Sequence, residues 1–227
     1  DRQSTEDSML ANEADDDVIQ LYTSGTTGFP KGVQLSSENY MAFFRQAFPQ
    51  GWAGYDEGDV ALNCMPLFHV AGVNFGLLTA AQGAKAVILR DIDPQIILKL
   101  VEEHKVKHTF WVPAVILMLT QQPNVRDVDF SALQNVSYGA SPIAEDLLKT
   151  AVEIMGCNFH QLYGLSETIG AGACLPPSAH DPAKGKLRAC GLPWAGAEVR
   201  TVDGDGKPTG PGEVGEICIK APFVMKG

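Results

Sequence analysis

One short stretch of the sequence concentrates residues that could bind a phosphate group. From Tyr22 to Gly32 the chain reads YTSGTTGFPKG, which combines small hydroxyl side chains, glycines and a lysine. Glycines let backbone N–H groups turn toward one anion, hydroxyls add donors, and lysine supplies a mobile positive charge. The stretch predicts a phosphate-binding loop, with a plain flexible turn as the alternative. The residues concerned are Thr23, Ser24, Gly25, Thr26, Thr27, Gly28 and Lys31.

This loop differs from the Walker A loop of phosphate-loop hydrolases. That pattern requires glycine where this chain has Pro30, and serine or threonine where it has Gly32. A phosphate-loop hydrolase, which would turn over ATP without any carboxylic acid, is therefore a disfavoured alternative.

Three further groups of residues follow or flank predicted strands. Residues 139–141 read GAS, and such small side chains let a planar ring approach the backbone. Residues 161–168 read QLYGLSET and include Glu167, whose carboxylate is a ligand type that suits Mg²⁺, although a solvated loop acid is the alternative. Residues 66–72 read PLFHVAG, in which His69 has a purely structural role as its alternative.

Taken in order, these groups resemble motifs of the adenylate-forming superfamily, which comprises acyl-CoA synthetases, nonribosomal peptide adenylation domains and firefly luciferase. The QLYGLSET segment resembles that family's Tyr-Gly-x-Thr-Glu motif, with Ser166 in place of the usual threonine. The resemblance extends from about Asp17 to the end of the sequence. It implies catalytic roles for Lys31, Ser166 and Glu167, and a magnesium position at Glu167 and Thr23.

The resemblance also assigns residues around the nucleotide and the acid. Tyr163 would stack on adenine and Gln161 would lie near its exocyclic amine, with core packing and capping as the respective alternatives. Besides the phosphate loop, the implied nucleotide contacts are Gly139, Ala140, Ser141, Gln161, Leu162, Tyr163, Gly164 and Ser166. The implied substrate contacts are Phe68, His69, Trp111 and Leu165, and further acyl-pocket candidates are Phe75 and Val112. For Trp111, Leu165, Phe75 and Val112, ordinary core packing is an equal alternative.

The resemblance implies an ATP-dependent ligase that joins a small-molecule carboxylic acid to coenzyme A through an acyl-adenylate. ATP or AMP, Mg²⁺ and coenzyme A are the implied cofactors and co-substrates. The PLFHVAG and YGLSET segments look most like fatty or aromatic acid CoA ligases. The family's ribose-binding aspartate and C-terminal catalytic lysine cannot be placed in this chain. We therefore expect the central nucleotide- and acyl-binding segment of a larger protein, nearly inactive by itself.

Two other classes remain as alternatives at this point. A peptide-synthetase adenylation domain or a luciferase-like enzyme would form the adenylate without making a thioester with coenzyme A. A non-catalytic module would keep the adenylate or acyl pocket for sensing or scaffolding.

The elements around these groups alternate between strand and helix. Strands are predicted at residues 18–22, 60–64, 85–89, 108–111, 136–138 and 157–162. Helix starts are predicted at Ser37, Pro94, Pro113 and Ala144. Because parallel strands need crossover connections, this alternation predicts an α/β fold with a largely parallel sheet covered by helices on both faces. We expect an incomplete piece of a larger fold.

Three regions are expected along the chain. Residues 1–17 form an acidic leader, which is usually a solvated linker. Residues 18–188 form the α/β nucleotide- and acyl-binding segment. Residues 189–227 begin a truncated β-rich subdomain, a distorted barrel by the resemblance, in which runs at 197–202 and 216–220 flank glycine-rich turns typical of antiparallel hairpins.

Composition narrows the functional class. The net charge of −10 and the lack of any Lys/Arg cluster argue against a nucleic-acid partner. No apolar stretch is long enough for a transmembrane helix, and no secretory signal is recognised, so a cytoplasmic location is expected. Five cysteines without a Cys-x-x-Cys spacing indicate reduced thiols. A homodimer formed through exposed strand edges is a further prediction, which light scattering would test.

Overall fold

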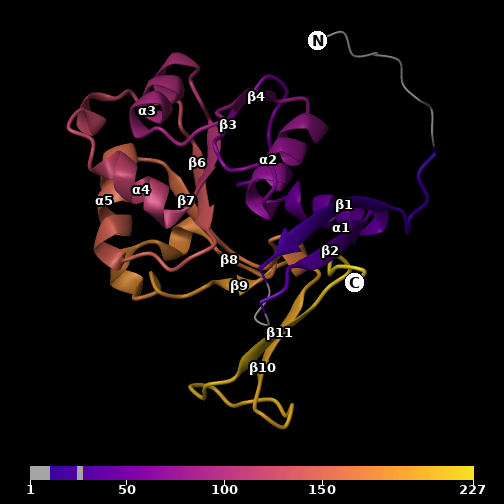
Figure 1. The fold of residues 1–227 in the computed structure, drawn as a ribbon. Helices are drawn as coiled ribbons and strands as arrows, with labels where there is room; N and C mark the ends of the chain where they lie inside the picture. The colour runs from indigo at the N-terminus through magenta and orange to yellow at the C-terminus, as the bar shows by residue number, and fades with distance from the viewer. Residues whose placement is uncertain (1–10, 25–27) are drawn as a thin grey trace.

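A seven-stranded sheet forms the centre of the structure (Figure 1). The structure is a computed structural model that describes residues 11–24 and 28–227. The spatial order of the strands is β4 (Lys85–Ile88), β3 (Val60–Asn63), β5 (His108–Trp111), β6 (Asn135–Gly139), β7 (Asn158–Tyr163), β8 (Ala173–Leu175) and β9 (Leu192–Pro193). The strands from β4 to β7 run parallel, whereas β8 and β9 are antiparallel to their neighbours.

Helices cover both faces of this sheet. α2 (Val70–Ala81) connects β3 to β4, and α3 (Pro94–Glu103), α4 (Pro113–Thr120) and α5 (Glu145–Met155) provide the later crossovers. The connection from β3 to β4 runs toward one edge of the sheet, and the connection from β4 to β5 runs back past β3 toward the other edge. Because parallel crossovers are right-handed, this reversal places α2 on one face of the sheet and the later helices on the opposite face. Figure 1 shows α3, α4 and α5 together on one side and α2 on the other. The predicted α/β fold is confirmed.

Local sequence explains where these helices begin and end. The Asp93 carboxylate accepts hydrogen bonds from the backbone N–H groups of Gln95 and Ile96 at 2.9 and 3.2 Å. Pro94 fills the first helical position, where no intrahelical N–H bond is lost. α5 ends at Gly156, whose φ of 62° lies in the left-handed region. The structure starts or caps helices at the predicted Pro94, Pro113 and Ala144.

The first helix, α1 (Ser37–Ala47), is capped one residue earlier than expected. The Ser36 hydroxyl accepts from the Asn39 N–H at 3.2 Å, and the Asn39 side-chain oxygen accepts from the Ser36 N–H at 3.0 Å. α1 thus starts at the predicted Ser37, while its capping residue is Ser36. A capping box needs partners three residues apart, and Ser36 with Asn39 has that spacing.

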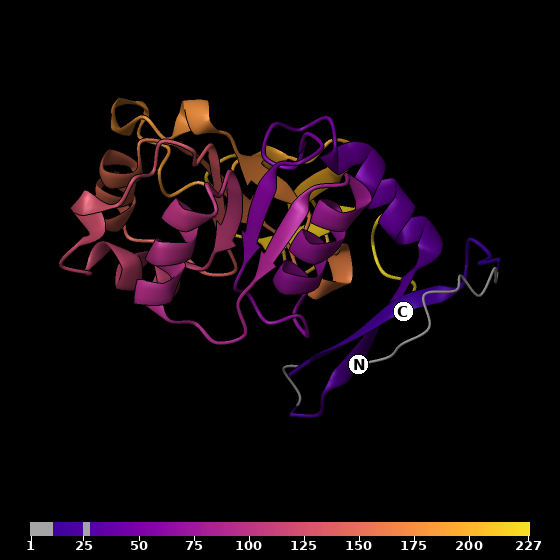
Figure 2. The same cartoon turned by 90° about the horizontal axis from the view of Figure 1, so that it is seen from above.

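The predicted phosphate loop connects two strands of an antiparallel hairpin. β1 (Asp17–Thr23) was predicted, but β2 (Lys31–Ser36) was not. Val33 and Leu35 of β2 are buried while Gln34 between them is exposed, which is the alternation expected of a half-buried strand. Seen from above, the hairpin stands apart from the large sheet (Figure 2).

A second antiparallel hairpin lies near the end of the chain, as predicted. β10 (Glu198–Val202) pairs with β11 (Glu216–Lys220), and the pair extends away from the large sheet (Figure 1). β9 belongs to the large sheet, so the separate hairpin begins at Glu198. Short 3₁₀ helices occupy η1 (Val125–Asp127), η2 (Ser166–Thr168), η3 (Pro177–Ala179) and η4 (Pro182–Lys184).

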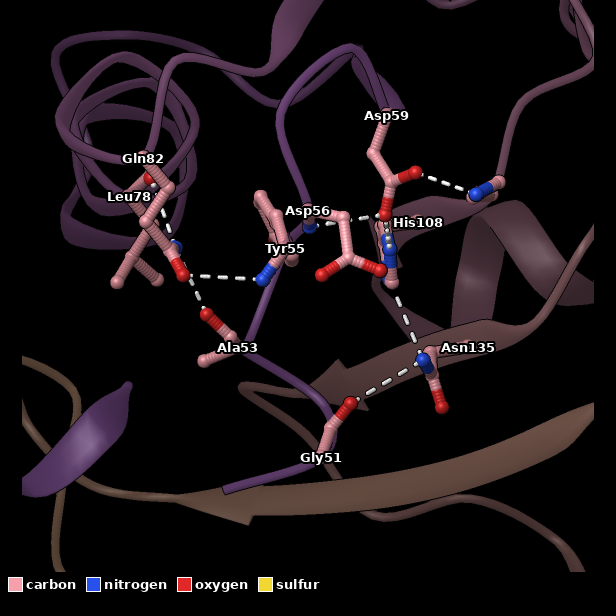
Figure 3. A network of polar contacts seen from close by, with 10 residues as sticks. Gly51, Ala53, Tyr55, Asp56, Asp59, Leu78, Gln82, His108 and Asn135 are labelled. Carbon is pink, nitrogen blue, oxygen red and sulfur yellow. Dashed lines mark hydrogen bonds and ion pairs between the residues drawn. The ribbon is translucent and has the colours of Figure 1, made fainter. Parts of the chain in front are cut away.

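A buried polar network lies at the amino-terminal ends of the parallel strands (Figure 3). The Asp59 carboxylate pairs with Lys107 and lies 3.2 Å from Nε2 of His108. The Asn135 amide nitrogen lies 3.2 Å from His108 Nδ1, and its oxygen lies 3.1 Å from His160 Nε2. Because Nδ1 of His108 faces an amide N–H, the proton of this imidazole sits on Nε2, toward Asp59. The network ties β3, β5, β6 and β7 together.

Candidate functional site

The sheet topology brings most of the predicted site residues to one edge. In an open parallel sheet, ligands bind beyond the carboxyl ends of the strands, next to the point where strand order reverses. Here that point lies between β3 and β5. The GAS segment follows β6, the YGLSET segment follows β7, and the PLFHVAG segment follows β3. Groups far apart in the sequence therefore lie at the same edge.

A cavity of about 900 Å³ opens at the ends of β6 and β7. This volume lies within the range of about 300–1,000 Å³ that is usual for small-molecule sites. Its walls are residues 139–145, residues 161–165 and a segment before β9. The predicted residues that line it are Gly139, Ala140, Ser141, Gln161, Leu162, Tyr163, Gly164 and Leu165.

Sequence reasoning missed one wall of this cavity. Leu187, Arg188 and Cys190 line it from the segment that leads into β9. Leu187 is buried, while the Arg188 side chain is exposed and adds a positive charge to a cavity that Glu145 also lines. No local pattern marks these residues, because only the return of β9 to the large sheet brings them to the cavity.

Two glycines allow the backbone at the cavity to pack closely. A Cβ atom on Gly139 would lie 2.2 Å from the Leu162 carbonyl oxygen, and one on Gly164 would lie 2.2 Å from the Gly170 carbonyl carbon. Ala140 lies in the first cavity segment and Ile169 follows the second, and their φ values are 67° and 54°. Residues with a side chain rarely adopt this left-handed region, and a β-branched residue such as isoleucine especially so. Backbone strain is thus concentrated at this site.

A chain of polar contacts holds Gln161 at the cavity wall. The Tyr138 hydroxyl lies 3.4 Å from Gln161 Oε1 and 3.0 Å from His180 Nε2. His180 Nδ1 donates to the Pro176 carbonyl oxygen at 2.9 Å, so Nε2 is the acceptor in the neutral ring. Burial lowers the pKa of His180, and burial raises the pKa of Tyr138. Both groups are therefore uncharged near pH 7. The single hydroxyl hydrogen of Tyr138 is shared between two acceptors, His180 Nε2 and Gln161 Oε1, and Gln161 receives the longer of the two bonds.

The described phosphate-binding and metal-binding candidates lie on two neighbouring elements, the β1–β2 hairpin and η2. Thr23 and Lys31 are cross-strand partners at the loop end of the β1–β2 hairpin, where the predicted phosphate loop leaves β1 and enters β2. η2, which carries Ser166 and Glu167, packs against β2. The Glu167 backbone oxygen accepts from the Met225 N–H at 2.7 Å, which fixes η2 in place.

Part of the predicted phosphate loop is not covered by the structure. Ser24 and Gly28 are exposed at the ends of the two strands, whereas Gly25, Thr26 and Thr27 lie outside the described residues. Within residues 11–24 and 28–227, no group of three His, Cys, Asp or Glu side chains is arranged to hold a metal ion. A single carboxylate such as Glu167 fits Mg²⁺ that is held mainly by substrate phosphates.

A second, apolar cavity of about 70 Å³ adjoins the first. The two cavities share Ala140, Leu162 and Gly164. The remaining walls of the smaller cavity come from α1 and the segment after it, from α2, from β5, and from the segments after η2 and β9. They include Phe43, Trp52, Asn74, Phe75, Phe110 and Trp194. The two cavities therefore meet at the carboxyl end of the sheet.

The structure separates the predicted substrate residues. Phe75 lines the small cavity and Leu165 the large one. Trp111 is completely buried and lines neither cavity, because Phe110 takes the cavity-facing side of β5 and adjacent strand residues point to opposite faces. Phe68 and His69 are exposed at the start of α2, with ring centroids 4.7 Å apart. Val112 is half-buried at the start of α4, outside both cavities.

Together, a parallel sheet of this topology and a cavity at the carboxyl ends of its strands are typical of α/β proteins that bind nucleotides. The sequence model of one family, described as AMP-binding enzyme, matches residues 2–227. The chain belongs to this family.

Individual relatives agree with this assignment. A fatty acid–[acyl-carrier-protein] ligase, ScoC, of Streptomyces coeruleorubidus is 37% identical over 93% of this chain and 41% of its own length. The medium/long-chain-fatty-acid–CoA ligase FadD8 of Mycobacterium tuberculosis is 36% identical over 96% of this chain and 38% of its own length. The chain thus spans about two fifths of these curated relatives.

The fold also matches solved structures. The o-succinylbenzoate CoA synthetase MenE of Bacillus subtilis, solved in complex with ATP and magnesium ion, has a TM-score of 0.85 and 28% identity. That match covers 100% of this chain and 46% of the MenE chain. The N-terminal domain of FACL13 from Mycobacterium tuberculosis gives a TM-score of 0.83 at 26% identity, covering 100% of this chain and 54% of that domain. Among the described residues, none of the helices has the length and hydrophobicity needed to span a bilayer.

Proposed function

We propose that this chain is the nucleotide- and acyl-binding part of an ATP-dependent carboxylate ligase that forms an acyl-adenylate and then an acyl thioester. The observation that supports this most strongly is the pair of adjoining cavities. One has the size of a nucleotide site, the other is apolar, and they share Ala140, Leu162 and Gly164. Such a pair suits a ligand in which a nucleotide is joined to an acyl group.

In this proposal, the larger cavity holds the adenosine part of the ligand. The adenine ring lies between the backbone at Gly139–Ser141 and the ring of Tyr163. Gln161, held by Tyr138, accepts a hydrogen bond from the exocyclic amine. Close packing of Gly139 against Leu162 keeps this wall thin enough for a flat ring to approach.

The hairpin and η2 hold the phosphates. Lys31 and the N–H and hydroxyl groups of the phosphate loop stabilise charge on the phosphoryl oxygens, which is the main requirement of phosphoryl and nucleotidyl transfer. Glu167 and Thr23 would hold Mg²⁺, which screens negative charge between the phosphates. A carboxylate oxygen of the acid forms a bond to the α-phosphorus, and the bond from that phosphorus to pyrophosphate breaks.

In the second half of the reaction, a thiolate attacks the acyl carbon and AMP leaves. We propose coenzyme A as the thiol, with Phe68 and His69 at the start of α2 lining its entry. The sequence of ScoC, described as an acyl-carrier-protein ligase, makes a carrier-protein thiol the second candidate. Both acceptors carry the same chemistry, so supplying each thiol to the adenylate-forming protein and measuring thioester formation distinguishes them.

Acid-dependent exchange between ATP and pyrophosphate, measured in the protein that carries this chain, tests the proposal. Lys31→Ala should lower the exchange rate by about 10²–10³, as expected for loss of one charged donor to the reacting phosphate. Lys99→Ala, which removes an exposed lysine from α3, is the matched control and should leave the rate unchanged. A non-catalytic module would bind nucleotide but give no exchange with any acid, and that result would overturn the proposal.

A further inference from the structure

Aromatic side chains line the small apolar cavity that adjoins the large one. We infer that the acid accepted by this chain carries a compact, apolar acyl group, smaller than a benzene ring, and that Trp52 and Trp194 set this limit. The inference rests on the proposed function, since it assigns the small cavity to the acyl group.

Two tryptophans from distant parts of the chain close the cavity. Trp52 follows α1 and Trp194 follows β9, yet their rings stack with centroids 5.4 Å apart and planes 20° apart. Both line the cavity, and they are 3% and 5% exposed. The ring of Phe43 packs against Trp194 at 5.3 Å. In this inference, the packed rings stop a longer chain at this wall of the cavity.

A shared hydrogen-bond acceptor fixes the two rings. Gln50 Oε1 accepts from Trp52 Nε1 at 3.0 Å and from Trp194 Nε1 at 2.6 Å. Both indole N–H groups are thereby satisfied, so rotating either ring away would leave a buried donor unpaired. Gln50 itself donates to the Gln46 carbonyl oxygen of α1 at 3.0 Å. The closure is thus part of the folded framework.

The size and polarity of the cavity define the acyl group. Its volume of about 70 Å³ is less than half of the roughly 150 Å³ of an engineered cavity that binds benzene. At roughly 30 Å³ for a group the size of a water molecule, it holds about two such groups, so the chain beyond the carboxylate is limited to a few carbon atoms. Asn74, a polar residue in its wall, is already bonded to Tyr40 at 3.0 Å and to the Ile169 carbonyl at 2.7 Å. This amide therefore favours an apolar acyl group over one with a polar end.

Activation of a series of straight-chain acids from acetate to dodecanoate tests the inference. In the protein that carries this chain, exchange between ATP and pyrophosphate should be at least about tenfold faster with butanoate than with octanoate. Trp194→Ala should open the closed end and shift the preferred acid by several carbons toward longer chains. Gln50→Leu keeps both rings but removes their shared acceptor, and should broaden the range of acids accepted. Trp194→Phe keeps a ring at the position and should retain the short-chain preference.

The possible outcomes separate this inference from the proposed function. If octanoate and dodecanoate are activated as well as butanoate by the unaltered protein, the inference is overturned while the ligase assignment stands. The same holds if a folded Trp194→Ala variant keeps the original profile. If that variant does not fold, the acid profile of Gln50→Leu, which leaves the rings in place, is compared with that of the unaltered protein instead. An unchanged profile in Gln50→Leu then overturns the inference. If no acid supports exchange, the proposed function fails and the inference fails with it.

Discussion

The position of Glu167 depends on packing between elements that are distant in the sequence. Its side chain is half-buried on a short 3₁₀ helix, and its backbone is fixed by Met225. Only the packing of η2 against β2 brings it toward the phosphate-loop hairpin. At the residue scale, its proposed role is to hold Mg²⁺ together with substrate phosphates.

Glu167→Gln tests that role directly. The amide keeps the shape of the side chain but loses the negative charge, so half-maximal exchange should need about tenfold more Mg²⁺ and the maximal rate should fall. Unfolding temperature should change little because the side chain is not part of the core. Glu153→Gln, an exposed substitution on α5, serves as control. An unchanged Mg²⁺ dependence would contradict the assignment.

Tyr138 offers a second test at the same scale. Tyr138→Phe removes the hydroxyl that holds Gln161, so the preference for ATP over ITP, which lacks the exocyclic amine, should fall by about five- to tenfold, the value of one hydrogen bond. Tyr55→Phe is the matched control, because the Tyr55 hydroxyl is also buried but has no hydrogen-bond partner. Equal selectivity in Tyr138→Phe and the unaltered protein would show that this contact does not position Gln161.

At the scale of elements, α2 contains one glycine that close packing requires and one that it does not. A Cβ on Gly72 would lie 2.2 Å from the Pro66 carbonyl oxygen, whereas the nearest atom to a Cβ on Gly76 lies at 3.6 Å. Both glycines are in the same helix. The start of α2 is thus pressed against the loop that follows β3.

These two glycines make a matched pair for stability measurements. Gly72→Ala should lower the free energy of unfolding by about 2 kcal/mol or more, because the helix must move away from the loop. Gly76→Ala should be neutral or stabilising by up to about 1 kcal/mol through helix propensity. Urea denaturation of both variants measures the difference. Equal stability of the two variants would mean that the helix adjusts without cost.

The elements also show what the sequence could and could not predict. The strand at residues 108–111 was predicted with its observed bounds, because a short run of β-branched and aromatic residues lies between polar segments. α2 was not predicted, since it is apolar on nearly all sides and His69 makes no side-chain cap. β9 is too short to give a pattern, so the wall formed by Leu187 and Arg188 was not predicted either.

The same limit applies to the acyl side of the site. Family resemblance pointed to Trp111, but the alternation along β5 turns Phe110 to the cavity. The pairing of Trp52 with Trp194 depends on packing between segments that are distant in sequence. Spacing along the chain carries no information about such contacts.

At the scale of the whole molecule, the two ends of the parallel sheet have different tasks. The carboxyl ends carry the cavities, while the amino ends carry the buried network of Asp59, His108 and Asn135 (Figure 3), which His160 joins through Asn135. Burial lowers the pKa of His108, although the Asp59 carboxylate acts in the opposite direction. Burial lowers the pKa of His160 to about 4. Both rings are therefore neutral in the folded protein near pH 7.

This arrangement predicts a loss of stability in mild acid. The unfolded chain takes up a proton on each histidine near pH 6.5, whereas folded His160 resists protonation until about pH 4. The stability that the neutral rings contribute is thus complete above about pH 6.5 and decreases as pH falls, by about 3 kcal/mol near pH 4 for His160.

The variant His160→Gln isolates this effect. Glutamine keeps a donor for Asn135 but does not titrate in this range, so unfolding free energy should depend less on pH between 6.5 and 4 than in the unaltered protein. Urea denaturation at several pH values provides the comparison. Identical pH profiles for the two proteins would remove His160 as a source of acid sensitivity.

The central claim is that the two adjoining cavities bind one acyl-adenylate. Calorimetric titration of this chain with AMP, with butanoate and with a non-hydrolysable butanoyl-adenylate analogue tests it most directly. Because the analogue fills both cavities at once, it should bind at least about 10²-fold more tightly than AMP, and Ala140→Leu at the junction should remove that advantage. An analogue that binds no more tightly than AMP would contradict the claim.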